Sequence, residues 1–123
     1  MIGHGGYDNI QSTSARVGGD ITVTAGNDFD FEAGQGLYAQ AQIGHVGVRH
    51  TVADFVDSDI SVTAGGDIHL TGVQSASGNN RGSYAKIGHG GYQADVQTAG
   101  EGYVGNIDVH ADGTVVMTSG VDH

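Results

Sequence analysis

Residues 58–72 read SDISVTAGGDIHLTG. Hydrophobic residues occupy every second position from Ile60 to Ala64 and again at Ile68 and Leu70, and the turn-forming residues Gly65, Gly66 and Asp67 separate the two runs. Alternation with a period of two indicates half-buried strands, and β-branched residues favour them. Clustered Gly and Asp favour turns. The stretch therefore predicts two short strands joined by a tight turn.

The same stretch occurs twice more. Residues 19–26 read GDITVTAG and precede DFDFEA at 28–33, while residues 105–112 read GNIDVHAD and precede TVVMT at 114–118. A second motif alternates with it, as IGHGGY at 2–7 and 87–92 and as IGHVGV at 43–48. Ile43 follows Ile2 by 41 positions and Ile87 follows Ile43 by 44. Such a period is typical of repeat architectures, so the chain is read as three copies, approximately 1–41, 42–85 and 86–123.

The expected fold is all-β. No segment of a dozen residues carries a helical apolar stripe free of glycine, and the connections are too short for helical crossovers. We therefore predict one solenoid over residues 1–123, a parallel β-helix with about two coils in each repeat of ~41 residues. In it, Ile21, Ile60 and Ile107 would take matching interior positions two coils apart. The same holds for Val23, Val62 and Val109. A β-propeller and an antiparallel sandwich are the alternatives; three units cannot close a propeller.

Composition limits the partners. The chain has 23 glycines among 123 residues, no cysteine and no proline, and its formal net charge is −10 with four basic residues. A nucleic acid requires a basic surface, so it is not expected as a partner. The absence of cysteine removes disulfides and cysteine-based zinc sites. No run reaches the ~20 apolar residues of a membrane helix, so membrane insertion is not expected either.

The chain opens on a repeat motif and no basic-then-apolar leader precedes it. We therefore expect a piece of a longer array, or a subunit that stacks end to end. Stacking is expected because a solenoid without polar caps leaves unpaired strand edges that template further pairing.

The strings GDITVTAGND, SDISVTAGGDIHLTG and SYAKIGHGG resemble repeats of the filamentous haemagglutinin type, which occur in large exported bacterial adhesins and exoproteins. The resemblance covers essentially the whole chain. It implies a right-handed parallel β-helix shaft, extracellular or at the bacterial cell surface, that serves as a structural or adhesive rod. Surface glycans or proteins of host or neighbouring cells would be its partners. The positions that match inward residues of this family are Ile21, Val23, Ile60, Val62, Ile68 and Leu70, and those that match its turns are Gly26, Gly65 and Gly66.

The histidines of the repeated motif, His4, His45 and His89, are candidate metal ligands. In every second coil they would lie roughly 9–10 Å apart, which is too far for them to share one ion. The structural interpretation, which we favour, is that each histidine sits at a corner and bonds neighbouring backbone carbonyls.

Acidic residues supply a candidate calcium site. Asp28, Asp30 and Glu32 form an outward stripe, and Asp20, Asp59 and Asp67 recur at turn entries. Calcium requires 6–8 oxygen ligands gathered in space, whereas aspartate is common at turns because its side chain bonds the local backbone. Asp28, Asp30 and Asp67 are therefore candidates only, and no cofactor is expected.

Catalysis is not expected, because no nucleophile or metalloprotease motif is present. The alternative function is a glycan-binding or glycan-cleaving β-helix, with Tyr7, Tyr92 or Tyr103 as sugar platforms and paired carboxylates as catalysts. The polar stretch at residues 72–83 is longer than its counterpart in the first copy, and we expect it to form a surface loop.

Overall fold

The computed structural model describes residues 1–4, 12–47, 51–73, 83–91, 93–96 and 102–120, and all regular structure in these ranges is β-strand. The strands follow the sequence copies. The first copy holds β1 (Ser12–Val17), β2 (Ile21–Ala25) and β3 (Phe29–Glu32). The next segment of chain forms β4 (Ala41–Ile43), β5 (Thr51–Phe55), β6 (Ile60–Ala64) and β7 (Ile68–Thr71). The last forms β8 (Ala85–Ile87), β9 (Asp95–Val96), β10 (Ile107–Ala111) and β11 (Val115–Thr118).

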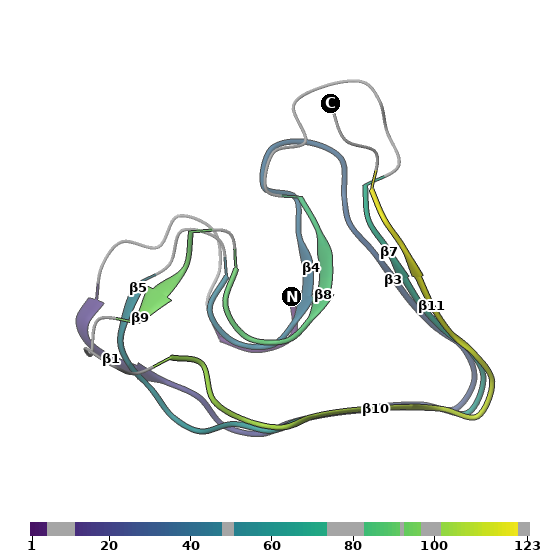
Figure 1. The fold of residues 1–123 in the computed structure, drawn as a ribbon, viewed down its shortest axis with the longest axis horizontal. Helices are drawn as coiled ribbons and strands as arrows, with labels where there is room; N and C mark the ends of the chain where they lie inside the picture. The colour runs from purple at the N-terminus through teal and green to yellow at the C-terminus, as the bar shows by residue number, and fades with distance from the viewer. Residues whose placement is uncertain (5–11, 48–50, 74–82, 92, 97–101, 121–123) are drawn as a thin grey trace. The chain divides into compact units, whose positions relative to one another are not determined.

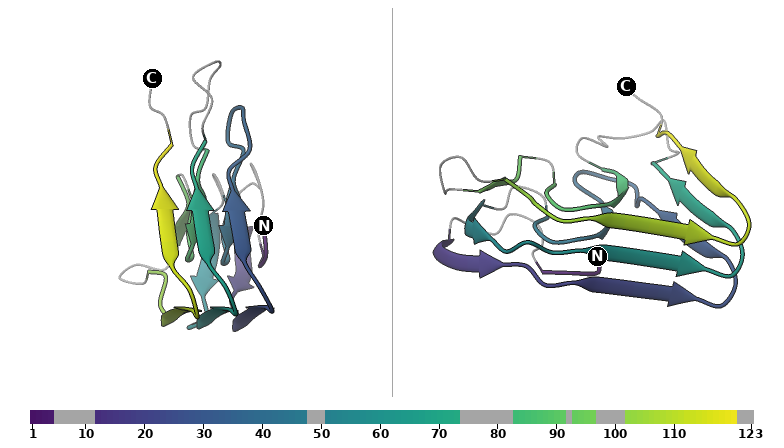
Figure 2. Two further views of the ribbon diagram at one scale, coloured as in Figure 1. Left: turned by 90° about the vertical axis from the view of Figure 1, so that its right-hand side faces the viewer. Right: turned by 60° about the horizontal axis from the view of Figure 1, so that its bottom comes forward.

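Equivalent strands of the three copies lie side by side (Figure 1). Strand β5 lies between β1 and β9, β6 between β2 and β10, and β7 between β3 and β11, while β4 pairs with β8. The ladders of the first and third of these sheets are parallel. Figure 2 shows β3, β7 and β11 as three arrows that point the same way. The prediction of an all-β fold with parallel strands is confirmed.

The prediction of two coils per repeat is wrong. Phe29 pairs directly with Ile68, and Ile68 with Val115, so each copy adds one strand to each of these sheets. The aspartate side-chain bonds between successive copies, from Asp28 to Asp67 and from Asp67 to Thr114, span 39 and 47 residues, which is about one full repeat. The physical reason is that the two halves of a repeat differ. Only at the full period do glycines, aspartates and apolar residues meet their own equivalents in the neighbouring strand.

Residue contacts divide the chain into two compact units, and each takes a segment from all three copies. Unit 1 comprises Met1–Ile21, Ile43–Ser61 and Ile87–Asp108. It holds the sheet β1-β5-β9 and a buried cluster of Val46, Val52 and Phe55. Arg16 donates to Asp54 across β1 and β5, with 2.7 Å between Nε and Oδ2.

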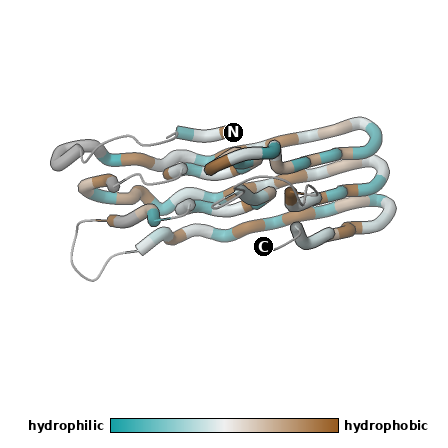
Figure 3. The backbone as a smooth tube through the Cα atoms, turned by 90° about the horizontal axis from the view of Figure 1, so that it is seen from above, coloured by the Kyte–Doolittle hydropathy of each residue, from teal (hydrophilic) through white to brown (hydrophobic). Residues whose placement is uncertain are grey.

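Unit 2 comprises Thr22–Gln42, Val62–Lys86 and Val109–His123. Its sheet β3-β7-β11 keeps one register, since Phe29, Ile68 and Val115 align, as do Asp30, His69 and Val116. In β7 the side chains of Ile68 and Leu70 are buried and those of His69 and Thr71 are half-exposed, as the alternation predicts. Figure 3 shows hydrophobic and hydrophilic segments alternating along the tube.

Burial depends on the copy. The middle strands β6 and β7 bury their apolar side chains, whereas those of β10 and β11 stay open: Ile60 is 1% exposed and Ile107 is 51% exposed. The predicted interior position of Ile107 is therefore wrong. Strand β10 is the last strand of its sheet, so within the described residues no further strand covers it.

The structure confirms the strands that the repeated sequence stretch predicts, which include β2, β6 and β7. The pattern did not predict β1 or β9, which have no regular apolar alternation. The expected loop at residues 72–83 lies mostly outside the described residues.

Candidate functional site

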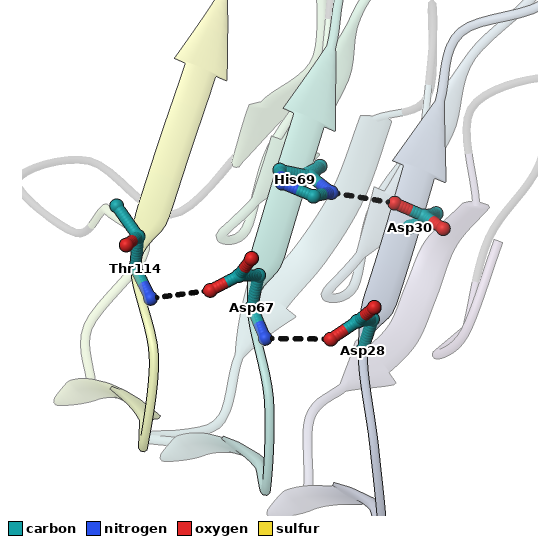
Figure 4. Close-up of polar contacts among 5 residues, drawn as sticks. All are labelled: Asp28, Asp30, Asp67, His69 and Thr114. Atoms are coloured by element: carbon teal, nitrogen blue, oxygen red, sulfur yellow. Dashed lines mark hydrogen bonds and ion pairs between the residues drawn. The ribbon is translucent and has the colours of Figure 1, made fainter.

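Two aspartates link the copies within unit 2 (Figure 4). The backbone N–H of Asp67 donates to Oδ1 of Asp28 at 2.9 Å, and the N–H of Thr114 donates to Oδ1 of Asp67 at 2.7 Å. We call Asp28, Asp67 and Thr114 the aspartate ladder. Each carboxylate stabilises the start of the equivalent strand in the next copy, since hydrogen bonds to a charged acceptor are the stronger kind.

Glycine makes room for this ladder. A Cβ atom added at Gly66 would collide with Oδ1 of Asp28, and one added at Gly113 would collide with Oδ1 of Asp67. The Gly-Asp pair of the repeat therefore works as one unit. The glycine has no Cβ atom and so leaves space for the aspartate carboxylate of the preceding copy. The sequence interpretation, that these aspartates bond their local backbone, is wrong for Asp28 and Asp67, since their carboxylates accept from the next copy.

Unit 1 contains a second ladder of the same kind. The N–H of Asp59 donates to Oδ1 of Asp20 at 3.0 Å, and the N–H of Asn106 donates to Oδ1 of Asp59 at 2.8 Å. The side-chain amide of Asn106 adds a bond of 3.1 Å to the same oxygen. Turn-entry aspartates in both units thus hold successive copies together.

Asp30 and His69 form an exposed ion pair on neighbouring strands of unit 2 (Figure 4). Nδ1 of His69 lies 2.8 Å from Oδ1 of Asp30. The hydrogen bond to Asp30 raises the pKa of His69 above the usual 6.5, and the negative charges of Asp30, Asp67 and Asp28 act in the same direction against a smaller lowering by desolvation. The pair is the only charge-to-charge contact that β3 and β7 make among the described residues.

The three motif histidines form a stacked column in unit 1. Ring centroids lie 5.0 Å apart for His4 and His45 and 5.3 Å apart for His45 and His89, with interplanar angles of 10° and 9°. The predicted spacing of roughly twice this value is wrong, because the histidines lie in equivalent turns of directly neighbouring copies. Phe55 packs on the column, with its ring centroid 4.8 Å from that of His89.

Both nitrogens of the middle ring are bonded to backbone. Nδ1 of His45 accepts the N–H of His4 at 2.9 Å, and Nε2 lies 2.7 Å from the carbonyl oxygen of Gly19. Since Nδ1 is an acceptor, Nε2 carries the proton and donates. His89 repeats the pattern with the N–H of His45 at 3.1 Å and the carbonyl of Ser58 at 2.9 Å. The expectation of carbonyl-bonded histidines is confirmed for His45 and His89.

A glycine permits this stacking too. Gly44 has φ +143°, and a Cβ atom there would collide with the carbonyl oxygen of Gly88 in the next copy. The glycine of the isoleucine-glycine-histidine motif therefore allows the backbones of two neighbouring copies to approach closely. The backbone conformation explains why the motif contains a glycine.

The candidate metal ligands are not gathered into a site in the part of the chain that the structure describes. There, no group of three or more His, Asp or Glu side chains is placed to hold a metal ion. Asp28 and Asp67 each direct one carboxylate oxygen at a backbone N–H, and Asp30 directs one at His69.

Unit 2 has an open hollow of about 370 Å³ beside the end of β11. Its lining includes Leu70, Ser83, Tyr84 and Met117, and none of the residues that line it is acidic, histidine or lysine. Ser83 donates to the carbonyl oxygen of Gly36, so its hydroxyl already has a backbone partner. Partial burial lowers the pKa of the nearby Lys86 in β8.

Of the three tyrosines predicted as sugar platforms, the structure describes Tyr103. Tyr7 and Tyr92 lie outside the described residues. Tyr103 packs against the buried cluster of unit 1, with its ring edge-on to Phe55 at a centroid distance of 5.2 Å. No helix that could span a bilayer is found among the described residues.

A comparison of the chain with family models, curated proteins and solved structures finds no match. The resemblance to filamentous haemagglutinin-type repeats stays a prediction from the sequence.

Proposed function

We propose that the chain is a non-catalytic structural segment: a right-handed parallel β-helix solenoid that serves as the shaft of a bacterial extracellular fibre or cell-surface adhesin. One observation carries the proposal. The distinctive residues of the repeat are used to hold one copy on the next, as Asp28 and Asp67 do by accepting a backbone N–H and as His45 does through both ring nitrogens.

This use of chemistry favours a rod over an enzyme. Carboxylates and imidazoles that serve catalysis are aimed at a substrate, with a hydrogen-bonded base beside a nucleophile. Here the buried imidazole of His45 is tied to backbone on both sides, and the hollow of unit 2 has no acid or base in its lining.

The proposed partners follow from charge and exposure. A net charge of −10 disfavours nucleic acids and anionic bilayers. The partners we propose are other copies of the repeat, through the open strand edges, and glycans or proteins on host or neighbouring cells. Neither membrane insertion nor a resident cofactor belongs to the proposal.

Labelling of intact cells tests the location. An antibody raised against the purified chain should bind intact bacteria that carry it, and permeabilisation should increase the signal little. Binding only after permeabilisation would contradict a surface shaft. Incubation with an oligosaccharide panel tests the alternative, because cleavage or saturable binding by the purified chain would replace the structural proposal with a glycan-directed one.

A further inference from the structure

The open edge of β11 has the same pattern of side chains as its covered neighbour. Val115 and Met117 take the register positions of Ile68 and Leu70, which are buried in β7. Yet Val115 is 40% exposed and Met117 is 75% exposed. The sheet thus carries an apolar column to its last described strand and leaves it uncovered there.

The opposite edge of the sheet is β3. Its pairing with β7 uses the N–H groups of Phe29 and Ala33, which donate to Asp67 and Thr71 at 2.8 and 2.9 Å. The next step repeats this geometry, since Ile68 and Gly72 donate to Thr114 and Thr118 at 2.9 and 2.8 Å. One operation therefore carries β3 to β7 and β7 to β11.

We propose that the β11 edge of one chain binds the β3 edge of a second copy, head to tail and in parallel register. A third application of the same operation places Val115 opposite Phe29 of the second chain, Met117 opposite Phe31, and Val116 opposite Asp30. The partner is a second copy of this chain, and the inference rests on the proposed structural function.

Charge favours this polarity. The outward side chains of β3 are Asp30 and Glu32, whereas those of β11 are Val116 and Thr118. Two β3 edges would bring carboxylates together, and like charges directly opposite each other destabilise a sheet. A β11 edge presents no charge to β3.

The turns before the two strands also fit. Within the chain, an aspartate in one copy requires glycine in the next, as Asp28 requires Gly66 and Asp67 requires Gly113. At the proposed junction Thr114 stands in place of the aspartate, and Asn27 stands in place of the glycine. A shorter side chain thus faces a residue that carries a Cβ atom. A heterologous contact of this kind does not close on itself, so it extends into a filament.

Cysteine cross-linking tests the junction, because the chain has no cysteine of its own. In the Val116→Cys/Asp30→Cys double variant, the two sites of one chain are separated by β7, roughly 9–10 Å apart, which exceeds disulfide reach. Across the junction they become direct neighbours at ~4.8 Å. Mild oxidation of the concentrated protein should give a ladder of dimers, trimers and longer products on non-reducing gels.

A register-shifted control uses Val116→Cys with Glu32→Cys. These sites are also outward and exposed, but across the junction they lie roughly 8 Å apart, so the ladder should be lost. Abundant dimer from Val116→Cys alone would overturn the proposal in favour of a two-fold contact between β11 edges. Absence of cross-linking in the first double variant, with strand content unchanged by circular dichroism, would overturn it as well.

A charge test needs no oxidation. Val116→Lys should strengthen self-association about fivefold and Val116→Glu should weaken it by a similar factor, because each new side chain would face Asp30 of the neighbour. Sedimentation velocity gives both values. Equal effects of the two substitutions would contradict the contact. These measurements on purified protein are independent of the cell-labelling experiment. The proposed junction can therefore be disproved while the surface location is supported, and the surface location can be disproved while the junction is supported.

Discussion

His45 shows how a single side chain can join three copies of a repeat. Its ring is stacked between those of His4 and His89, and it is 2% exposed. Because its two nitrogens pair with the N–H of His4 and the carbonyl of Gly19, the ring replaces backbone hydrogen bonds at a corner where strands end. Buried polar groups need such partners.

His45→Ala is therefore expected to lower the free energy of unfolding by about 2–4 kcal/mol. The substitution removes two hydrogen bonds and leaves two backbone groups without their partner, and each buried unsatisfied group costs about 1–3 kcal/mol. Urea unfolding followed by circular dichroism measures the change. His69→Ala is the matched control: its ring is exposed, so it should shift the midpoint little. Equal effects of the two substitutions would contradict the role of the column.

His69 gives a prediction on pH. Its hydrogen bond to Asp30 raises its pKa in the folded chain above the unfolded value of about 6.5. A raised folded pKa means that the ion pair adds stability below the unfolded pKa, while Asp30 stays ionised. That stability is lost as the pH rises through the folded pKa.

NMR titration of His69 should therefore give a pKa above that of an unstructured histidine, and Asp30→Asn should lower it towards that value. The melting temperatures of the unsubstituted chain and of the Asp30→Asn variant should differ more at pH 6 than at pH 9. An unchanged His69 titration in Asp30→Asn would show that the pair does not form in solution.

At the scale of strands, position within the sheet decides what a side chain contributes. Ile68 in β7 and Val115 in β11 share one register position, but Ile68 is fully buried and Val115 is exposed on an outer strand. Ile68→Ala should cost about 2–5 kcal/mol, as large-to-small changes in cores do. Val115→Ala should stay within about 0.5 kcal/mol in dilute solution. Thermal unfolding at low protein concentration compares them, and a large loss for Val115→Ala would mean that β11 is already covered there.

The turn after β4 depends on a glycine for a second reason besides φ. At Gly44 both the positive φ of +143° and the collision of a Cβ atom with Gly88 oppose any larger residue. Gly44→Ala is expected to destabilise the chain by about 1–3 kcal/mol from backbone strain, and further through the collision. Gly26→Ala is the control, because nothing lies within 4 Å of its would-be Cβ atom. A chemical denaturation series measures both, and a neutral Gly44→Ala would disprove the close approach.

At the scale of the whole chain, stability should fall from the middle copy to the outer ones. In unit 2, β7 has a partner strand on each side, whereas β3 and β11 each have one within the described residues. Amide hydrogen exchange should be slowest at Ile68, whose N–H is bonded to Thr114 at 2.9 Å, and faster at Val115. High protein concentration should slow exchange at Val115 selectively if the β11 edge becomes covered. Uniform exchange along the three strands would contradict a graded stability.

The repeat could be found in the sequence because its signals are local. Alternation over residues 60–64 and 68–71 placed β6 and β7, since side chains of a strand point to opposite faces in turn. The same dependence on local signals explains why the sequence does not predict β1 and β9. Residues 12–17 and 95–96 carry no clear alternation. In those segments, pairing with β5 selects the strand conformation.

Val46 shows how tertiary structure overrides a local preference. It takes φ +65°, close to the +71° of the equivalent Gly90, although a β-branched residue disfavours this region. Its side chain is fully buried with Val52 and Phe55. The packing free energy of that cluster therefore holds a turn that the residue alone would not choose.

The amino-acid sequence by itself determined that the chain is three copies of an all-β unit with an acidic surface, because composition and short-range periodicity are properties of neighbouring residues. Only the tertiary structure decided that each copy adds one strand to each of the three-stranded sheets, that Asp28 and Asp67 bond the next copy, and that the histidines stack about 5 Å apart. The physical reason is that register is set by contacts between residues about 40 positions apart. Alternative registers between distant strands differ in the free energy of the whole folded chain. A local sequence pattern does not show which register has the lowest free energy.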